Sequence, residues 1–369
     1  MAVPSLRMNY LGLLLVTTAT ATLLAASGYS PRTDLDQGRY LKVLAESSAR
    51  LSIDPRDALA LAGKSQALSA LMRFGEATAL AQQALALDPN LADAHLARGL
   101  ARAGSAVQQR NFGSLRQISG AMEDLRSATE RDPALQMAWT TLGVAYQQLP
   151  GLLGGSTRKA LASAAALERL APARGAALRG TILALDGKWW EADGSFQKAL
   201  GLAPGDPQVV LGYLDALADK SARKALGPEA QKSKLAAEAR RLAAGVRGSG
   251  RGMEAISGAL LEAGLPEEAW TAAESAMKSV DAPSLLRLQL GKLAARSGLH
   301  RQEGLAYLEQ VLKEPLEGGS GGYPAAHWRR GQILRDLGRS AEARRAAEAA
   351  LALDPRHPGA RRLLEDLDG

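Results

Sequence analysis

The side chains that could catalyse a reaction or bind a metal are few and scattered along this chain. There are four histidines, His95, His300, His327 and His357, and no two of them have H-E-x-x-H or other paired-ligand spacing. The chain has no cysteine to act as a nucleophile or as a zinc ligand. These residues predict no metal site and no cofactor.

Two short motifs resemble nucleotide-binding or catalytic sequences only locally. Gly63-Lys64-Ser65 ends like a phosphate loop, but the glycine required five positions earlier is Ala58, and no strand pattern precedes it. Ser156 and Lys159 have the S-x-x-K spacing of penicillin-binding enzymes. Three further Ser-x-x-Lys matches in the same chain indicate that this spacing arises by chance. We therefore predict no catalytic residue and a protein that is not an enzyme.

The elements that carry these residues follow a repeated pattern of aromatic, small and proline residues. Its clearest copy consists of Trp139, Leu142, Gly143, Tyr146, Ala160 and Pro172. This order matches W-x2-L-G-x2-Y followed by Ala and Pro, and the chain resembles tetratricopeptide repeat proteins over about 55–367. The resemblance implies antiparallel helix pairs stacked into a right-handed α-α superhelix that binds partners.

Prolines that close successive repeats give the period. Pro55 and Pro89 are 34 residues apart, the length of one such repeat, and the next intervals are 44, 39 and 32 residues. Two of these units therefore carry insertions. Because one helix pair is too small to bury its own apolar face, stacked neighbours must share a continuous core. The sequence predicts an all-α solenoid with no strands.

The expected division of the chain is a leader over 1–27, a leading helix within 28–54, a repeat solenoid over 55–355 and a capping helix within 356–369. The leading helix, at about 35–52, is expected to cover the open face of the first unit. The capping helix is expected at about 357–367. Eight helix pairs are predicted at about 56–88, 91–131, 135–170, 174–202, 206–245, 251–280, 283–313 and 324–354.

The first residues have the features of a secretory leader. Arg7 is the only charged side chain before Arg32, the run from Leu11 to Leu24 is apolar, and Ala25-Ala26-Ser27 offers a small-x-small cleavage site. We expect cleavage after Ser27 and a periplasmic or secreted protein. The alternative is an uncleaved inner-membrane anchor, although the apolar run is shorter than the roughly 20 residues of a spanning helix.

Two insertions interrupt the repeat pattern. Residues 104–117 are expected to form a solvated loop within the second unit. In the third unit, Gly154 and Gly155 are expected to form a tight turn and Ser156 to cap the next helix. Free amides of this turn, together with Arg158 and Lys159, could also hold a carboxylate or phosphate. A helix start with no ligand is the alternative.

The fifth unit carries most of the chain's net charge. Between Asp219 and Arg251 there are nine basic and three acidic residues, while the whole chain has a formal charge of +7. Such a surface attracts acidic peptides or anionic lipid headgroups. Nucleic acid is not expected because no aromatic residues are interleaved, and an ordinary solvated helix face is the alternative. The predicted basic patch is Lys220, Arg223, Lys224, Lys232, Lys234, Arg240 and Arg241.

The resemblance also implies that first helices line the inner face of the stack, where a partner binds. The predicted groove residues are Met137, Thr140, Val144, Gln147, Lys292, Arg296, Trp328, Gln332 and Arg335. Trp328 beside these cations suits an extended peptide with an anchoring side chain and a carboxylate. We therefore expect a protein-binding scaffold or adaptor of the bacterial cell envelope.

A second functional reading comes from two short stretches. The Gly154-Gly155-Ser156 turn and the Ala326–Gly331 stretch resemble exported bacterial tetratricopeptide proteins. More distantly, they resemble the helical-repeat component that accompanies TRAP-type solute transporters. The alternative function is therefore a ligand-binding accessory of a solute transporter or a small-molecule carrier.

Overall fold

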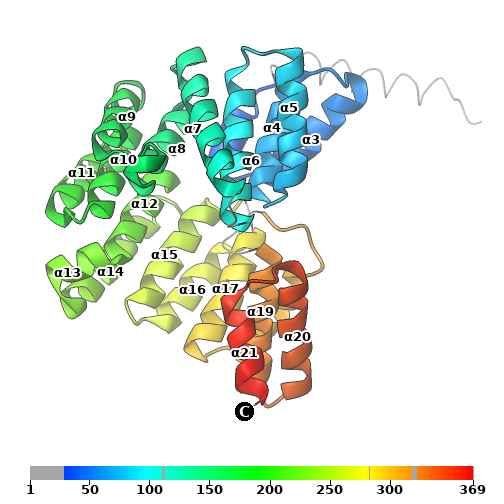
Figure 1. The fold of residues 1–369 in the computed structure, drawn as a ribbon. Coiled ribbons are helices and arrows are strands. Elements are labelled where there is room, and N and C mark those ends of the chain that lie inside the picture. The colour runs from blue at the N-terminus through cyan, green and yellow to red at the C-terminus, as the bar shows by residue number, and fades with distance from the viewer. Residues whose placement is uncertain (1–28, 110–112, 282, 318–321, 369) are drawn as a thin grey trace, which may run out of the picture.

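The computed structural model describes residues 29–109, 113–281, 283–317 and 322–368. Within these ranges the regular elements are α-helices, apart from the 3-10 turn η1 (Gly151–Leu153), and no strand is present (Figure 1). The predicted leader and its cleavage site lie outside the described residues. None of the described helices is long and apolar enough to cross a membrane.

The helices form eight consecutive units, as the proline spacing predicts. Two leading helices, α2 (Arg32–Asp36) and α3 (Tyr40–Ile53), precede them, and α21 (Pro358–Asp368) follows them. The units are α4 (Ala58–Ala70) with α5 (Phe74–Leu87), α6 (Ala92–Gln109) with α7 (Gly113–Arg131), α8 (Gln136–Gln148) with α9 (Thr157–Leu170), α10 (Pro172–Leu185) with α11 (Trp189–Leu202), α12 (Pro207–Ala218) with α13 (Lys220–Leu226) and α14 (Pro228–Ala243), α15 (Gly250–Glu262) with α16 (Pro266–Ala276), α17 (Pro283–Ser297) with α18 (Arg301–Val311), and α19 (Gly322–Asp336) with α20 (Ser340–Leu353). The predicted all-α solenoid is confirmed.

Glycines make the turns between the helices of several units. Gly187 and Gly264 end α10 and α15 with φ of +79° and +85°, a left-handed conformation that costs glycine little. At the other end of a helix, Asp57 accepts a hydrogen bond from the Ala60 amide and so caps α4. Each unit therefore encodes its own helix ends within a few residues of sequence.

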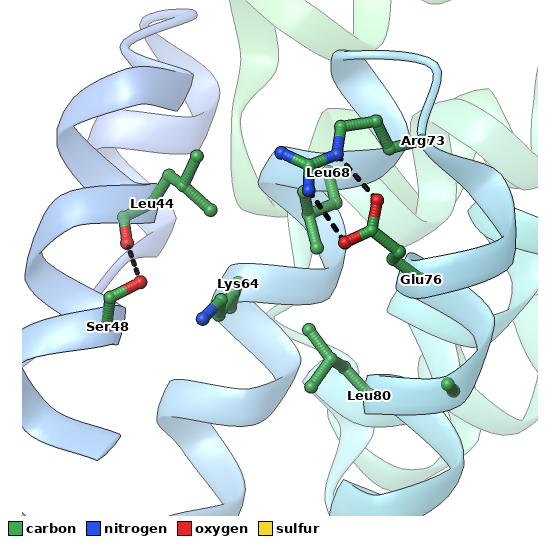
Figure 2. A pocket seen from close by; sticks show the side chains of 8 residues that line it. Leu44, Ser48, Lys64, Leu68, Arg73, Glu76 and Leu80 are labelled. Atoms are coloured by element: carbon green, nitrogen blue, oxygen red, sulfur yellow. Dashed lines mark hydrogen bonds and ion pairs between the residues drawn. The ribbon is translucent and has the colours of Figure 1, made fainter. Parts of the chain in front are cut away.

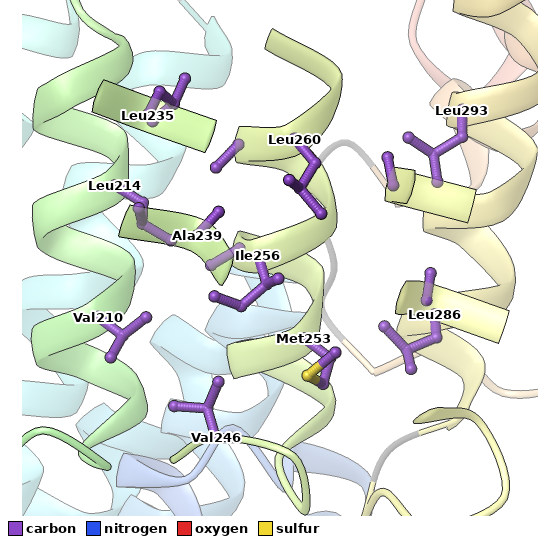
Figure 3. Close-up of a cluster of buried hydrophobic side chains, with 14 of the residues drawn as sticks. Val210, Leu214, Leu235, Ala239, Val246, Met253, Ile256, Leu260, Leu286 and Leu293 are labelled. Carbon is purple, nitrogen blue, oxygen red and sulfur yellow. The ribbon is translucent and has the colours of Figure 1, made fainter. Parts of the chain in front are cut away.

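Small residues inside the units bring the paired helices together. A Cβ atom placed on Gly291 would lie 2.3 Å from Cγ of Leu308, so α17 and α18 touch through this glycine. The apolar core then continues from unit to unit, as Figure 3 shows for Val210 of α12, Ile256 of α15 and Leu286 of α17. Neighbouring units thus keep water from each other's apolar faces, as the repeat pattern predicts.

Two details of the predicted fold are wrong. The insertion at 104–117 was expected to be a loop, but it lengthens α6 to Gln109 and lets α7 begin at Gly113, with 110–112 outside the described residues. The fifth unit was expected to be a helix pair, but it contains three helices. Gly227 has φ of +83° and Pro228 opens α14, and a proline cannot continue the preceding helix.

The solenoid curves until its last units lie beside its first (Figure 1). Nη1 of Arg356, just before α21, donates to the carbonyl of Gln109 at 2.8 Å. A Cβ atom on Gly322 would lie 2.8 Å from Cε of Met72 in the first unit. The inner face of the curved stack is therefore enclosed, and segments far apart in sequence meet across it.

Candidate functional site

Five consecutive units each place one side chain of an inner helix against residues 29–41. Each of these side chains lies in the first turn of the first helix of its unit, in units two to six. We call them the first-turn ladder: Asp93, Met137, Arg174, Gln208 and Arg251. We call residues 29–41, which lie along this ladder, the N-terminal strap.

The strap begins at the first two units. The hydroxyl groups of Tyr29 and Ser47 are 2.5 Å apart. Arg32 then makes two hydrogen bonds to the Asp93 carboxylate, at 2.9 and 2.6 Å, and an ion pair with Asp132 at 2.7 Å. The hydrogen bonds to Asp93 raise the pKa of Arg32 above its ordinary value. Asp93 is only 2% exposed and lies on α6, the first helix of the second unit.

The middle of the strap has one apolar anchor and one acidic anchor. Leu35 is 3% exposed and packs against Ala67 and Met137. The Asp36 carboxylate forms an ion pair with Arg174 at 2.6 Å, and its backbone carbonyl accepts a hydrogen bond from Gln208 at 2.9 Å. Side chain and backbone of the strap are thus both bound.

The strap ends at the sixth unit and the loops beyond it. Nη2 of Arg251 donates to the Tyr40 hydroxyl at 3.3 Å, and the guanidinium lies 5.8 Å from the ring centroid. Gly38, with φ of +76°, lets the backbone pass Arg251, since a Cβ there would lie 3.0 Å from its Nε. The Leu41 amide donates to Oε2 of Glu317 at 3.0 Å, and burial raises the pKa of this carboxyl group.

These contacts change the interpretation of the leading segment. The sequence predicts one leading helix at about 35–52 that covers the first unit. This is wrong in detail, because a turn with Gly38 at φ of +76° separates α2 from α3, although α3 does pack on α4. Residues 29–41 instead extend along the inner face to Glu317, and no sequence pattern in them signals this position. The predicted groove residue Met137 is consequently covered by Leu35, whereas Thr140 is exposed and Val144 and Gln147 are half-buried.

The inner face of the seventh and eighth units carries three neighbouring cations, which we call the inner cationic cluster: Lys292, Arg296 and Arg329. Arg296 forms an ion pair with Glu262. The Arg329 guanidinium lies 3.8 Å from the ring centroid of Trp328, and burial together with Arg296 lowers its pKa to about 10. Burial likewise lowers the pKa of Lys292, and Arg296 and Arg329 add to this effect.

Two members of the cluster lack a carboxylate partner. Within the described residues, neither Lys292 nor Arg329 forms an ion pair; the hydrogen bond from Arg329 goes to the amide oxygen of Gln332 at 2.9 Å. Sequence reasoning missed Arg329 because it lies one position beyond Trp328, outside the expected lining register. The structure thus brings the predicted residues Lys292, Arg296 and Gln332 together around an arginine that was not predicted.

Other predicted groove residues already have partners within the protein. Trp328 packs against Gly359 and lies 5.0 Å from the His357 ring, measured between centroids. Arg335 forms ion pairs with Asp336 at 2.9 Å and with Asp366 at 3.1 Å. A role for these two side chains in partner binding stays a prediction.

Carboxylates partly neutralise the predicted basic patch. Lys234 pairs with Asp193 at 2.8 Å and Arg240 with Glu268 at 2.6 Å, and both acids lie outside the segment whose charge the sequence counted. Lys232 and Arg241 pair with nearby glutamates as well. The exposed basic side chains that remain gather on the short helix α13: Lys220, Arg223 and Lys224.

The Gly-rich turn of the third unit uses its own amides. Those of Gly154, Gly155 and Ser156 donate to backbone carbonyls at 3.0, 3.1 and 2.7 Å, so the expectation of free amides is wrong. Ser156 caps α9 as predicted, accepting from the Lys159 amide at 3.3 Å. Anion binding here would rest on Arg158 and Lys159, both exposed, and stays a prediction.

Three histidines make packing or capping contacts, and that of His300 joins the seventh unit to the sixth. His95 lies 2.9 Å from the Pro89 carbonyl, His300 stacks on Trp270 at 4.3 Å between centroids, and His357 accepts from the Ala360 amide. No group of three or more potential metal ligands occurs in the part of the chain that the structure describes.

Two cavities lie near the start of the solenoid. One of about 460 Å³, between α3, α4 and α5, has an apolar floor that includes Leu44, Leu68 and Leu80, and the Arg73–Glu76 ion pair lies at its rim (Figure 2). Another of about 200 Å³ lies between the strap and the first-turn ladder. Neither is lined by the Gly154-Gly155-Ser156 turn, one of the two stretches on which the alternative of a small-molecule carrier rests.

Comparison with known proteins agrees with the repeat architecture. A family model for the tetratricopeptide repeat matches residues 324–357, which include nearly all of α19 and the whole of α20. The curated proteins include no match to the chain.

Several solved structures are similar in fold. One is TTC0263, a thermophilic TPR protein of Thermus thermophilus, with 21% identity, 51% of this chain and 99% of that chain covered, and a TM-score of 0.43. Another is the APC/C hetero-tetramer Cut9-Hcn1, with 16% identity, coverage of 95% and 59%, and a TM-score of 0.42. PilF of Pseudomonas aeruginosa has 16% identity, coverage of 64% and 99%, and a TM-score of 0.40.

Proposed function

We propose that this protein is a non-catalytic scaffold of the bacterial cell envelope that binds an extended acidic segment of a partner protein on its inner face. The observation that carries the proposal is the inner cationic cluster. Its cations lie on α17 and α19. Lys292 and Arg329 are half-buried and have no carboxylate partner in the described residues.

Electrostatics favours an anionic ligand at this cluster. Burial and mutual repulsion oppose the charged forms of Lys292 and Arg329, which is why their pKa values are lowered, and Glu254 offsets this only in part for Lys292. A carboxylate placed between them would remove the repulsion and supply the missing hydrogen-bond acceptors. The ring of Trp328 beneath the Arg329 guanidinium holds that side chain in a defined position.

Arginines on the outside of the stack differ from the inner cationic cluster because they already have carboxylate partners. Arg240 and Arg339 each make two hydrogen bonds to a glutamate, so their charges are already satisfied. Exposed pairs of this kind contribute little to stability or binding. The unpaired cations of the inner face are therefore the stronger candidates for contact with an acidic partner.

Binding of a defined peptide tests this function. The probe is a fluorescent peptide of alternating Glu and Ala, with a Gln/Ala peptide as its uncharged counterpart. We expect the Lys292→Ala/Arg329→Ala variant to bind the acidic peptide at least about tenfold more weakly than the wild type. A Lys232→Ala/Arg240→Ala variant is the matched control, because its cations are paired and lie elsewhere. Equal affinities of the two variants would reject the cluster as the binding surface.

The envelope location rests on the predicted leader and has its own test. Expression of the full chain in a bacterium, followed by fractionation and intact-mass measurement, is expected to give a periplasmic product that begins at Gly28. A cytoplasmic product of full mass would contradict the location, and a membrane-bound product of full mass would favour the anchor. A pull-down from envelope extract with the wild type and both variants then identifies partners that depend on the cluster.

A further inference from the structure

The N-terminal strap, which includes the short helix α2, is bound along its length the way a peptide ligand would be bound. One contact in each of five consecutive units falls in the first turn of the unit's first helix, at the first-turn ladder. Further contacts are made to Ser47, Ala67, Asp132 and Glu317. They also alternate in chemistry along the strap. Arg32 meets carboxylates, Leu35 meets an apolar surface, Asp36 meets Arg174, and Tyr40 meets Arg251.

We propose that the N-terminal strap is an internal ligand of the first-turn ladder, and that its release opens this surface to a partner segment of the same chemistry. That segment would form a helical turn like α2 and would carry a basic residue, then an apolar and an acidic residue in sequence, then an aromatic one. The inference rests on the proposed function only in taking the inner face as the binding face, since the ladder and the inner cationic cluster share no residue.

The strap is held by contacts that can exchange. The charged groups by which it contacts the ladder are partly exposed: the side chain of Arg32 is 40% exposed and that of Asp36 is 30% exposed. The buried Asp34 pairs instead with Arg39 and Lys42, outside the ladder. Leu35 is the only leucine, isoleucine, valine, methionine or phenylalanine within residues 29–39. Partly exposed ion pairs contribute little free energy, so the strap is held much less firmly than a helix of the stack.

The geometry of release is also simple. With cleavage after Ser27, as the sequence predicts, the strap is the N-terminal end of the mature chain, and a chain end leaves a groove without threading. At its other end, α3 packs on α4 and stays part of the solenoid. The cavity of about 200 Å³ already present between Leu35, Met137 and Arg174 shows that the strap does not fill the site completely.

Thiol labelling in the full chain tests whether the strap opens. The chain has no cysteine, so single substitutions introduce a single reactive thiol. Ala67→Cys places the thiol under Leu35, and Ala199→Cys places it in the core between units, where both alanines are 0% exposed. We expect a maleimide to label the Ala67→Cys variant at least about 100-fold faster under native conditions. Equal rates in two stably folded variants would show that the strap is a permanent brace and overturn the proposal.

A peptide added in trans tests whether the ladder recognises this chemistry. The probe is a fluorescent synthetic peptide of residues 29–42, and the strap is disabled in the full chain by Leu35→Asp/Asp36→Arg, which leaves the ladder intact. We expect this variant to bind the peptide at least about tenfold more tightly than the wild type does. Adding Arg174→Gln is expected to remove most of that gain.

Two outcomes separate this proposal from the proposed function. No peptide binding by a strap variant that keeps the wild-type circular dichroism spectrum would overturn the internal-ligand proposal and leave the scaffold function standing. Conversely, Lys292→Ala/Arg329→Ala introduced into the strap variant is expected to leave affinity for the 29–42 peptide unchanged. Loss of that affinity would mean that the peptide binds at the cationic cluster and not at the ladder.

Discussion

The two halves of the inner face use charge in opposite ways. Along units two to six, the first-turn ladder lies under the N-terminal strap, and its charged groups have partners there, as in the Arg32–Asp93 and Asp36–Arg174 pairs. In units seven and eight, Lys292 and Arg329 lie on the corresponding helices without such partners in the described residues. Equivalent surfaces of a repeat stack therefore become closed or open according to what the rest of the chain places over them.

The largest effect on the contrast is expected from Leu35→Asp, which releases the strap from the first-turn ladder of units two to six. It puts a carboxylate against Ala67 and Met137, where the unpaired charge and the lost apolar contact together cost about 3 kcal/mol of strap binding. The strap then detaches while the units stay folded. Limited proteolysis is expected to cut within 29–41 with an unchanged circular dichroism spectrum. Leu353→Asp, at an exposed leucine, is the control, and cutting of both variants alike would contradict the prediction.

A smaller loss of stability, measured as the free energy of unfolding, is expected from Arg174→Gln. This change leaves the carboxylates of Asp36 and Asp206 without their cation, at a cost of about 1 kcal/mol. Denaturant unfolding with a fixed slope measures it. Arg240→Gln, which removes an exposed pair with Glu268, is the matched control with an expected change near zero.

Lys292→Gln, in the half formed by units seven and eight, is expected to raise the free energy of unfolding, whereas Arg174→Gln lowers it. Removing one of the repelling, half-buried cations is expected to stabilise the unliganded protein by about 0.5–1 kcal/mol while weakening the binding of the acidic peptide. The same unfolding assay and the peptide titration measure the two effects. If Lys292→Gln and Arg174→Gln both destabilise the protein, the contrast between the halves does not hold.

The smallest effect is on the pH dependence of stability and comes from Glu317, at the end of the strap. Burial raises the pKa of Glu317, so the folded state keeps a proton that the unfolded state has already lost. The stabilisation is complete below the unfolded-state pKa and is lost as pH rises through the raised folded-state value. Glu317→Gln, whose amide oxygen still accepts from Leu41, is expected to gain about 0.5 kcal/mol at pH 7 and to flatten this pH dependence. An unchanged pH profile of stability would show that Glu317 is not the responsible group.

Helix boundaries and turns follow closely from the sequence because their causes are local. The glycine at 187 and the prolines at 172 and 207 act within a few residues, and the helices begin and end there as expected. The insertion at 104–117 was misjudged because a loop and a longer helix pair have similar local composition. In the structure Gly104 lies within α6 and packs against Phe74 of the first unit, since a Cβ there would lie 2.1 Å from the ring, a contact between units that local composition does not reveal.

In the candidate site, too, the sequence predicted what depends on a single helix and missed what depends on how the units stack. Repeat register was enough to predict Lys292 and Arg296 as neighbours on the inner face, because both lie on one helix. It could not predict which cations have partners. Lys234 and Asp193 are 41 residues apart, and Arg240 and Glu268 are 28 apart, so their pairing depends on how the units stack.

The sequence by itself determined the repeated helix pairs, the small residues that join them and the all-α stack, since each of these depends on interactions within a unit or between adjacent units. Tertiary structure alone decided that residues 29–41 lie along the inner face. Their contacts span 61 residues from Arg32 to Asp93, 172 from Asp36 to Gln208 and 276 from Leu41 to Glu317. The physical reason is that the curvature of the whole stack, which is a sum over all eight units, sets where its inner surface meets the beginning of the chain.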